Sequence, residues 1–276
     1  MNLKAFAQRA STAFFISAAF VITYLIGIPI YLALQGAGVE NVWVNNFVLR
    51  FGPALAGIAT IALLRGSEGL RDLFRRCVHW RIPPMYFLTA ILIQPAVLLA
   101  TLVIRGHWAD VQSLDPAAAI GAFAAYLLLT VLVGAGFGEE IGWRGFLQPQ
   151  LSQSRSPLAG SLLLGITWFA WHVPAYLLDP GNESSDPILP FLAIIFPFSI
   201  VHAWAYFRSK GSILLPAVLH GAIDASWYTL EDVLPQVTGT PGFQPAFDWT
   251  IAVFWYVIAT VILLKWGLNL GRQESQ

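Results

Sequence analysis

The residues that could carry chemistry lie in three short segments, which read GFGEEIGWRGF, TWFAWHVPAY and LLPAVLHGAIDAS. These segments contain two adjacent carboxylates, an arginine, two histidines and an aspartate, namely Glu139, Glu140, Arg144, His172, His220 and Asp224. Such side chains can remove a proton from water, stabilise a developing negative charge or bind a divalent metal. The chain has no HExxH, CxxC, GxSxG or Walker sequence, so the zincin, zinc-ribbon, hydrolase-elbow and nucleotide-binding classes lose support.

Helical spacing assigns different roles to the two carboxylates. Glu140 and Arg144 are four residues apart, in the order that favours an ion pair on one face of a helix. Glu139 lies about 100° around the same helix, where it meets no cation of that helix, so we expect it to act as a general base. The alternative is a purely architectural ion-pair network that holds helices together.

The two histidine segments allow similar alternatives. His220 and Asp224 share the four-residue spacing, so they would face one ligand or hydrogen-bond to each other as a structural pair. His172 is followed closely by Pro174, which bends a helix and frees backbone carbonyls; a plain hydrogen bond to another helix is the alternative role. His202 has no charged partner four residues away, and we interpret it as a core histidine.

The elements that must position these residues are membrane helices. The chain has 276 residues, of which 57% are hydrophobic and 11% charged, whereas soluble domains carry about 25% charged residues. Crossing the hydrocarbon of a bilayer takes ~20 apolar residues. Runs of near-spanning length lie at 12–34, 46–64, 86–104, 118–148, 158–178, 188–207, 212–230 and 249–268. We therefore predict an all-α, polytopic integral membrane protein with about eight transmembrane helices, a single domain over residues 1–276, and an active site inside the helix bundle.

The basic residues predict the orientation of these spans, because Lys and Arg collect in cytoplasmic loops. With the N-terminus inside, 12 of the 15 lie in cytoplasmic segments, one of which is the basic, partly amphipathic connector at 65–85, expected at the lipid headgroups. Arg105 lies on the other side, and Arg50 is near enough to a helix end to reach the interface. We expect a prokaryotic plasma membrane, with both termini cytoplasmic. The net charge of zero and the lack of a long basic run argue against a nucleic-acid partner.

The predicted spans bring the three segments together. At 1.5 Å per residue, Glu139, His172, His220 and Asp224 lie ~12–21 Å from the cytoplasmic ends of three separate helices. Charged residues at that depth are costly and usually functional. A water-based mechanism and one that uses a divalent metal such as zinc, held by Glu139, His172, His220 and Asp224, both remain open.

These residues resemble the CAAX protease and bacteriocin-processing (CPBP, or Abi) family of intramembrane proteases, over roughly residues 45–230. Glu139, Glu140 and Arg144 are similar to its EExxxR motif, His172 to the histidine of its FxxxH motif, and His220 with Asp224 to its HxxxN/D motif. The resemblance implies an eight-helix type of fold and peptide-bond cleavage near a membrane face. It also implies that Glu139 and His172 activate water, while His220 and position 224 form an oxyanion site.

Two positions differ from the family pattern. Trp168 stands where the second motif often has Phe, an exchange that preserves an aromatic wall. Asp224 replaces the Asn of the eukaryotic CAAX proteases, and an ionised carboxylate would repel an oxyanion unless it were protonated, paired with His220 or bound to a metal.

The sequence therefore predicts an intramembrane endopeptidase that acts on a peptide or protein substrate entering from the cytoplasmic side or the membrane, with membrane lipid as its surroundings. A transporter would also need intramembrane Glu, His and Asp, but no internal repeat is visible. A catalytically silent bacteriocin-immunity or binding protein with the same fold is the third interpretation.

Overall fold

The computed structural model describes residues 10–39, 41–178, 188–238 and 248–272, and these residues form helices and no strand. The first helical region runs without interruption through α2 (Ser11–Phe20), the π-helical η1 (Val21–Gly27) and α3 (Ile28–Gly36). The other helices follow in this order: α4 (Val42–Arg50), α5 (Gly52–Cys77), α6 (Pro84–Ile104), α7 (Trp108–Ser113), α8 (Pro116–Leu132), α9 (Ala135–Gly142), η2 (Trp143–Leu147), α10 (Gln148–Leu151), α11 (Pro157–Leu178), α12 (Ile188–Arg208), α13 (Leu214–Val233), α14 (Pro235–Thr238), α15 (Trp249–Trp266) and η5 (Gly267–Asn269).

Seven helical regions within the described ranges are long and apolar enough to cross a membrane. They are Ser11–Gly36, Val42–Cys77, Pro84–Ile104, Pro116–Leu151, Pro157–Tyr176, Ile188–Arg208 and Trp249–Asn269, and they correspond to seven of the eight predicted spans. The eighth, predicted at 212–230, is the 20-residue α13. Its polar residues lower its hydropathy, and it lies inside the bundle, where protein surrounds it. The prediction of a polytopic all-α membrane protein is confirmed.

The apolar run predicted as a single span at 118–148 is broken rather than straight. α8 ends at Leu132, and α9 begins at Ala135 after an extended residue, Gly134 (φ −104°, ψ −150°). A Cβ on Gly134 would lie 2.9 Å from Thr130 Cα, so a side chain would obstruct this turn. The break places the EExxxR motif on its own short helix, which continues into the π-helical turn η2.

The segment predicted as a connector at 65–85 is helical as far as Cys77. α5 bends at Gly66, where a positive φ of 58° suits a residue without a side chain. Beyond this bend the helix carries several arginines, as expected for a segment at the headgroups.

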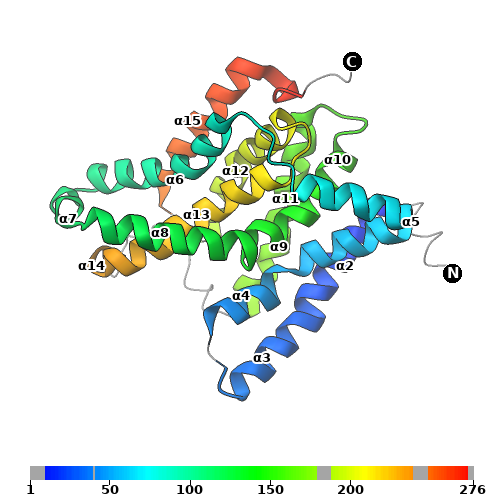
Figure 1. Ribbon diagram of the computed structural model, residues 1–276, viewed down its shortest axis with the longest axis horizontal. Helices are drawn as coiled ribbons and strands as arrows, with labels where there is room; N and C mark the ends of the chain where they lie inside the picture. Colours follow the sequence, from blue (N-terminus) through cyan, green and yellow to red (C-terminus); the bar gives the residue numbers. More distant parts are fainter. Residues whose placement is uncertain (1–9, 40, 179–187, 239–247, 273–276) are drawn as a thin grey trace.

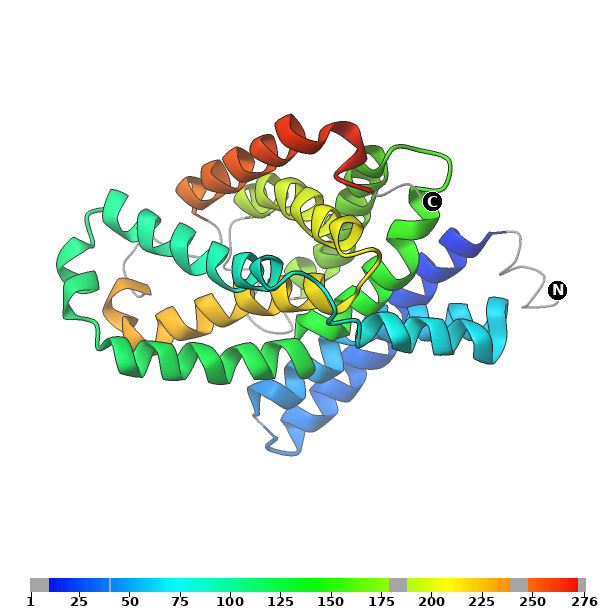
Figure 2. The ribbon, with the colours of Figure 1, turned by 45° about the horizontal axis from the view of Figure 1, so that its top comes forward.

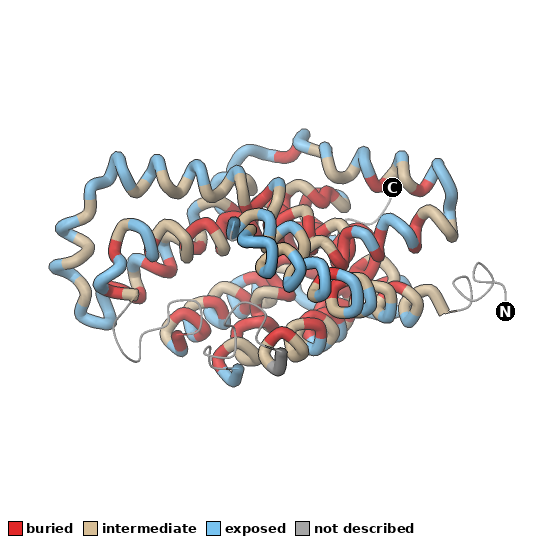
Figure 3. Tube along the Cα trace, turned by 90° about the horizontal axis from the view of Figure 1, so that it is seen from below, coloured by how far each residue is buried: buried red, intermediate tan, exposed pale blue. Residues whose placement is uncertain are grey.

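α13 lies at the centre of the molecule, with α6 and α8 running along it and α9 against it (Figures 1 and 2). Burial is concentrated in this middle region, whereas the outer helices present exposed surface (Figure 3). Much of that outer surface is apolar, with Leu25, Ile120 and Leu264 between 69% and 83% exposed. Exposed side chains of this size suit lipid rather than water.

Hydrogen bonds join the basic loops on one face of the molecule. Ile213 N donates to Arg76 O at 2.9 Å, and Ser212 Oγ to His79 O at 2.9 Å. Arg272 Nη2 donates to Ser152 O at 2.9 Å, so the chain after α15 contacts the loop after α10. Loops that the charge pattern assigned to one side of the membrane therefore do lie together.

Candidate active site

Glycines allow the helix with the two carboxylates to lie directly against α4 and α5. A Cβ on Gly142 would lie 2.2 Å from Pro53 O, and a Cβ on Gly138 would lie 2.9 Å from Arg50 O. The facing residue of α5 is also a glycine, Gly57, whose own Cβ would lie 3.0 Å from Gly142 Cα. Small residues permit this approach of two backbones. α4 and α5 are thereby held beside Glu139 and Glu140.

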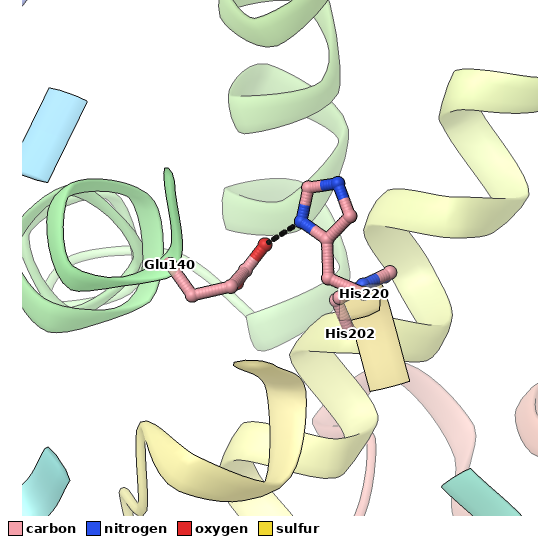
Figure 4. A group of neighbouring side chains, drawn as sticks. All are labelled: Glu140, His202 and His220. Atoms are coloured by element: carbon pink, nitrogen blue, oxygen red, sulfur yellow. Dashed lines mark hydrogen bonds and ion pairs between the residues drawn. The ribbon is translucent and has the colours of Figure 1, made fainter. Parts of the chain in front are cut away.

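Glu140 forms the centre of a buried charged network. Its Oε1 accepts a hydrogen bond from Arg144 Nη1 at 2.9 Å, which confirms the predicted ion pair. The same oxygen lies 2.8 Å from His220 Nδ1 (Figure 4). Because an ionised carboxylate only accepts, Nδ1 of His220 carries the proton in this contact. Glu140 and Arg144 are fully buried and His220 is 5% exposed, so the three groups compensate one another away from water.

Glu139 is held by three donors from different parts of the chain. Its Oε2 accepts from the indole nitrogens of Trp143 at 3.2 Å and Trp168 at 2.7 Å. Its Oε1 lies 3.4 Å from Arg50 Nη1, and the Arg50 side chain is only 29% exposed. Arg50 therefore gives Glu139 a cationic partner from a different helix, which the spacing within the Glu139 helix did not predict. The reason is tertiary, because the glycine contacts bring the end of α4 to α9.

Trp168 connects Glu139 to the histidine of the second motif. Its side chain donates to Glu139, while its backbone oxygen lies 2.9 Å from His172 Nδ1. A carbonyl can only accept, so Nδ1 of His172 bears the proton and Nε2 of the neutral ring carries a lone pair. The Trp168 ring also lies 5.3 Å from the His220 ring, centroid to centroid. Residues of three helices thus meet around one indole, as the depth argument predicted.

Asp224 lies one helical turn after His220 and is partly buried. His220 Nδ1 contacts Glu140 rather than this carboxylate, so the structure does not show the direct His220–Asp224 pair, which was the alternative to a shared ligand. Asp224 therefore lies one turn along α13 from the network of Glu140, Arg144 and His220, with no hydrogen bond to His220 among the described residues.

His202 is a neighbour that the sequence analysis assigned to the core. Its ring is fully buried and lies 5.4 Å from that of His220. Nδ1 lies 2.8 Å from Phe198 O, while Nε2 has no hydrogen-bond partner among the described residues. Glu140 Oε2 is likewise buried without such a partner. No sequence motif marks His202, so only the fold could show that it belongs here.

Glu140, His202 and His220 form a group that could hold a metal ion, with one ligand atom of each lying within 4.8 Å of the others (Figure 4). One carboxylate and two imidazoles form a common ligand set of catalytic zinc sites. The predicted metal ligands were Glu139, His172, His220 and Asp224, so this group shares only His220 with that prediction.

The comparisons with known proteins agree with the motifs. The sequence model of the family described as "Type II CAAX prenyl endopeptidase Rce1-like" matches residues 121–226, which contain all three motifs. The curated protein "CAAX prenyl protease 2" of Methanococcus maripaludis is 26% identical over 184 residues, which cover 62% of this chain and 67% of that protein. No solved structure matches. Over the residues that carry the three motifs, the chain is therefore similar to the type II CAAX prenyl endopeptidases.

Proposed function

We propose that this protein is an intramembrane endopeptidase that hydrolyses a peptide bond with a water molecule activated by Glu139 and His172. The observation that supports this assignment best is the double contact of Trp168, which bonds the Glu139 carboxylate through its indole and the His172 ring through its carbonyl. One residue thus orients both groups that would act on the water.

In the proposed reaction, Glu139 takes a proton from the water while His172 Nε2 accepts a second hydrogen bond from it. The water oxygen bonds to the substrate carbonyl carbon, and the carbonyl becomes an oxyanion. When the C–N bond breaks, Glu139 returns the proton to the departing amine nitrogen. Arg50 and the two indole donors hold the carboxylate in its ionised, proton-accepting form.

His220 is the proposed donor to the oxyanion. Its Nδ1 is held by Glu140, which Arg144 holds in turn, so Nε2 of the ring has a defined direction. As an imidazolium, His220 would donate from Nε2 to the developing charge. Asp224 would assist only when protonated, because an ionised carboxylate would repel the oxyanion. In this scheme Glu140 and Arg144 position His220.

The proposed substrate is a peptide segment that reaches the site from the cytoplasmic side or from the membrane. The relative from Methanococcus maripaludis is named as a CAAX prenyl protease, so prenylated peptides belong among the first substrates to test. Transport and silent peptide binding would require the same intramembrane residues, but the matched family and relative are both named as proteases.

Metal-assisted hydrolysis is a second candidate, and the unpaired atoms of the Glu140 group favour it. Glu140 Oε2 and His202 Nε2 are buried and have no hydrogen-bond partner in the part of the chain that the structure describes, and His220 lies beside them. These three residues would hold a divalent ion such as zinc, which would polarise the substrate carbonyl. The guanidinium of Arg144, whose Nη1 lies 2.9 Å from Glu140 Oε1, opposes a second cation at the same carboxylate.

Cleavage of a quenched fluorescent peptide library, with prenylated members included, tests both candidates. The wild type is compared with Glu139→Gln, which keeps the shape of the side chain but loses its basicity, and with Glu231→Gln on the exposed part of α13 as a matched control. Retention of cleavage only by the wild type and the control supports the proposal. Equal cleavage by Glu139→Gln, or no cleavage by the wild type, contradicts it.

The same proteins separate the two mechanisms. The metal content of the purified wild type and of His202→Ala is measured directly, and cleavage is repeated after treatment with a chelator. Bound metal that disappears in His202→Ala, together with loss of cleavage in chelator, supports the metal mechanism. Metal-free protein that still cleaves supports activation of water by Glu139 and His172 alone.

A further inference from the structure

A cavity lined by both polar and apolar residues lies apart from the proposed catalytic residues, on the face where the basic loops meet. It has a volume of about 220 Å³ and lies between α5, the residues that follow Arg144, and the end of α12. Its polar lining includes Arg65, Asp72, Arg76 and Tyr206. The geometry points to a binding site for the phosphate of an anionic phospholipid in this cavity.

Arg76 provides a fixed cation in the wall. Its Nη2 donates to Gly145 O at 2.9 Å, and its Nη1 lies 3.4 Å from Tyr206 Oη. Nε lies 3.3 Å from Asp72 Oδ2, yet it is buried without a hydrogen-bond partner among the described residues. An arginine held in place by a carbonyl, a phenol and a carboxylate presents a fixed positive charge to the cavity, which suits a phosphate oxygen.

The charges of the cavity leave room for an anion. Arg65 also approaches Asp72, with Nη1 3.7 Å from Oδ2, but this guanidinium is 58% exposed and only loosely held. Two arginines therefore share a single carboxylate, and the net charge of the lining is +1. A phosphodiester carries one negative charge and would neutralise the net positive charge of the lining.

The other walls and the surroundings favour a lipid over a soluble anion. Ile61, Leu64 and Phe146 form the apolar part of the lining, which suits the glycerol and upper acyl region of a phospholipid. Farther along the same segment, Phe74 and Trp80 are each 68% exposed, as aromatic residues at a membrane interface are. A cation that sits beside apolar walls and exposed aromatics is suited to a headgroup.

A contact links this cavity to the catalytic motif. The Gly145 carbonyl that accepts from Arg76 belongs to the residue directly after Arg144. Glu139 and Glu140 do not line the cavity, so a bound lipid would leave the catalytic groups uncovered.

The test uses the full-length protein, stripped of lipid in a neutral detergent. Short-chain phosphatidylglycerol is titrated against it while thermal unfolding is recorded, with phosphatidylcholine of the same chain length and soluble glycerophosphate as parallel probes. Arg65→Ala is the informative variant, because its exposed side chain makes a loss of folding improbable on packing grounds. Arg75→Ala is the matched control, since Arg75 is exposed on the same helix but does not line the cavity.

We expect phosphatidylglycerol to raise the unfolding midpoint of the wild type more than phosphatidylcholine does. Arg65→Ala should raise the half-saturating lipid concentration about fivefold, the ratio that corresponds to ~1 kcal/mol per arginine at a membrane surface, while Arg75→Ala leaves it unchanged. If both substitutions raised the half-saturating lipid concentration equally, the lipid would be attracted by the general surface charge rather than by this cavity, and the proposal would be overturned. An equal shift with glycerophosphate would make this a free-anion site. Displacement of the lipid by a peptide carboxylate, but not by its amide, would assign the cavity to substrate.

Discussion

The contact between α9 and α5 gives a quantitative prediction for Gly142→Ala. The new Cβ would lie 2.2 Å from Pro53 O and 2.5 Å from Pro53 C, both backbone atoms that cannot rotate away. Overpacking of this kind costs about 1–3 kcal/mol, and the absence of a flexible neighbour places this case at the upper end. Alanine regains ~1 kcal/mol in a helix relative to glycine. The net destabilisation should be ~2 kcal/mol.

Gly121→Ala is the matched control, because Gly121 lies in α8 with nothing within 4 Å of its hypothetical Cβ. This substitution should stabilise the protein by up to ~1 kcal/mol through helix propensity alone. Thermal unfolding of both variants is compared with that of the wild type in the same detergent at one scan rate. Gly142→Ala should also weaken cleavage, since it pushes the start of α5, and with it the nearby Arg50 at the end of α4, away from Glu139. A Gly142→Ala protein that unfolds no earlier than Gly121→Ala would refute the close-packing argument.

Three further predictions concern single side chains. Trp168→Phe removes the N–H that donates to the buried Glu139 carboxylate, so it should destabilise the protein by about 1.5–3 kcal/mol in thermal unfolding. Trp204→Phe is the control, because the buried N–H that it removes has no partner among the described residues. In the same unfolding assay this second variant should be neutral or stabilising. Arg144→Ala leaves a buried carboxylate without its arginine and should cost ~3–5 kcal/mol, while Arg155→Ala on the surface should stay within ~0.5 kcal/mol by thermal unfolding. The orientation can be tested after the single cysteine of the chain has been replaced. Cysteines introduced one at a time at positions 155 and 105 should react with a membrane-impermeant maleimide from opposite sides of sealed vesicles. Labelling of both positions from the same side would contradict the predicted orientation.

Features with a short sequence range could be predicted from the sequence. The Glu140–Arg144 pair follows from a spacing of four residues, and the structure confirms it at 2.9 Å. The long apolar helices follow from composition, because each needs only about 20 consecutive apolar residues. The break at Gly134 was missed, since the hydropathy stays high across it and only the crowding against Thr130 shows why the helix stops.

Features that depend on packing between distant helices could not be predicted. Arg50 lies 89 positions before Glu139, and no helical periodicity relates the two. His202 enters the site only because α12 packs beside α13, and its own sequence surroundings resemble those of any apolar helix. Trp168 was assigned to a wall because the family often has Phe there, yet its indole N–H contacts the proposed base. In each case the relevant distance depends on how helices cross.

The cost of the buried charges suggests why the site is built around them. Replacing a buried ion pair with apolar residues of similar volume is often neutral or stabilising, because desolvation offsets much of the Coulomb attraction. The Glu140–Arg144 pair is therefore a poor way to hold two turns of a helix together. An apolar pair could not orient the ring of His220, because it offers no hydrogen-bond acceptor. Glu140 Oε1 lies 2.8 Å from His220 Nδ1, and this contact sets the direction in which Nε2 points. The network is therefore better explained as the support of His220, the proposed donor to the oxyanion, than as a structural ion pair.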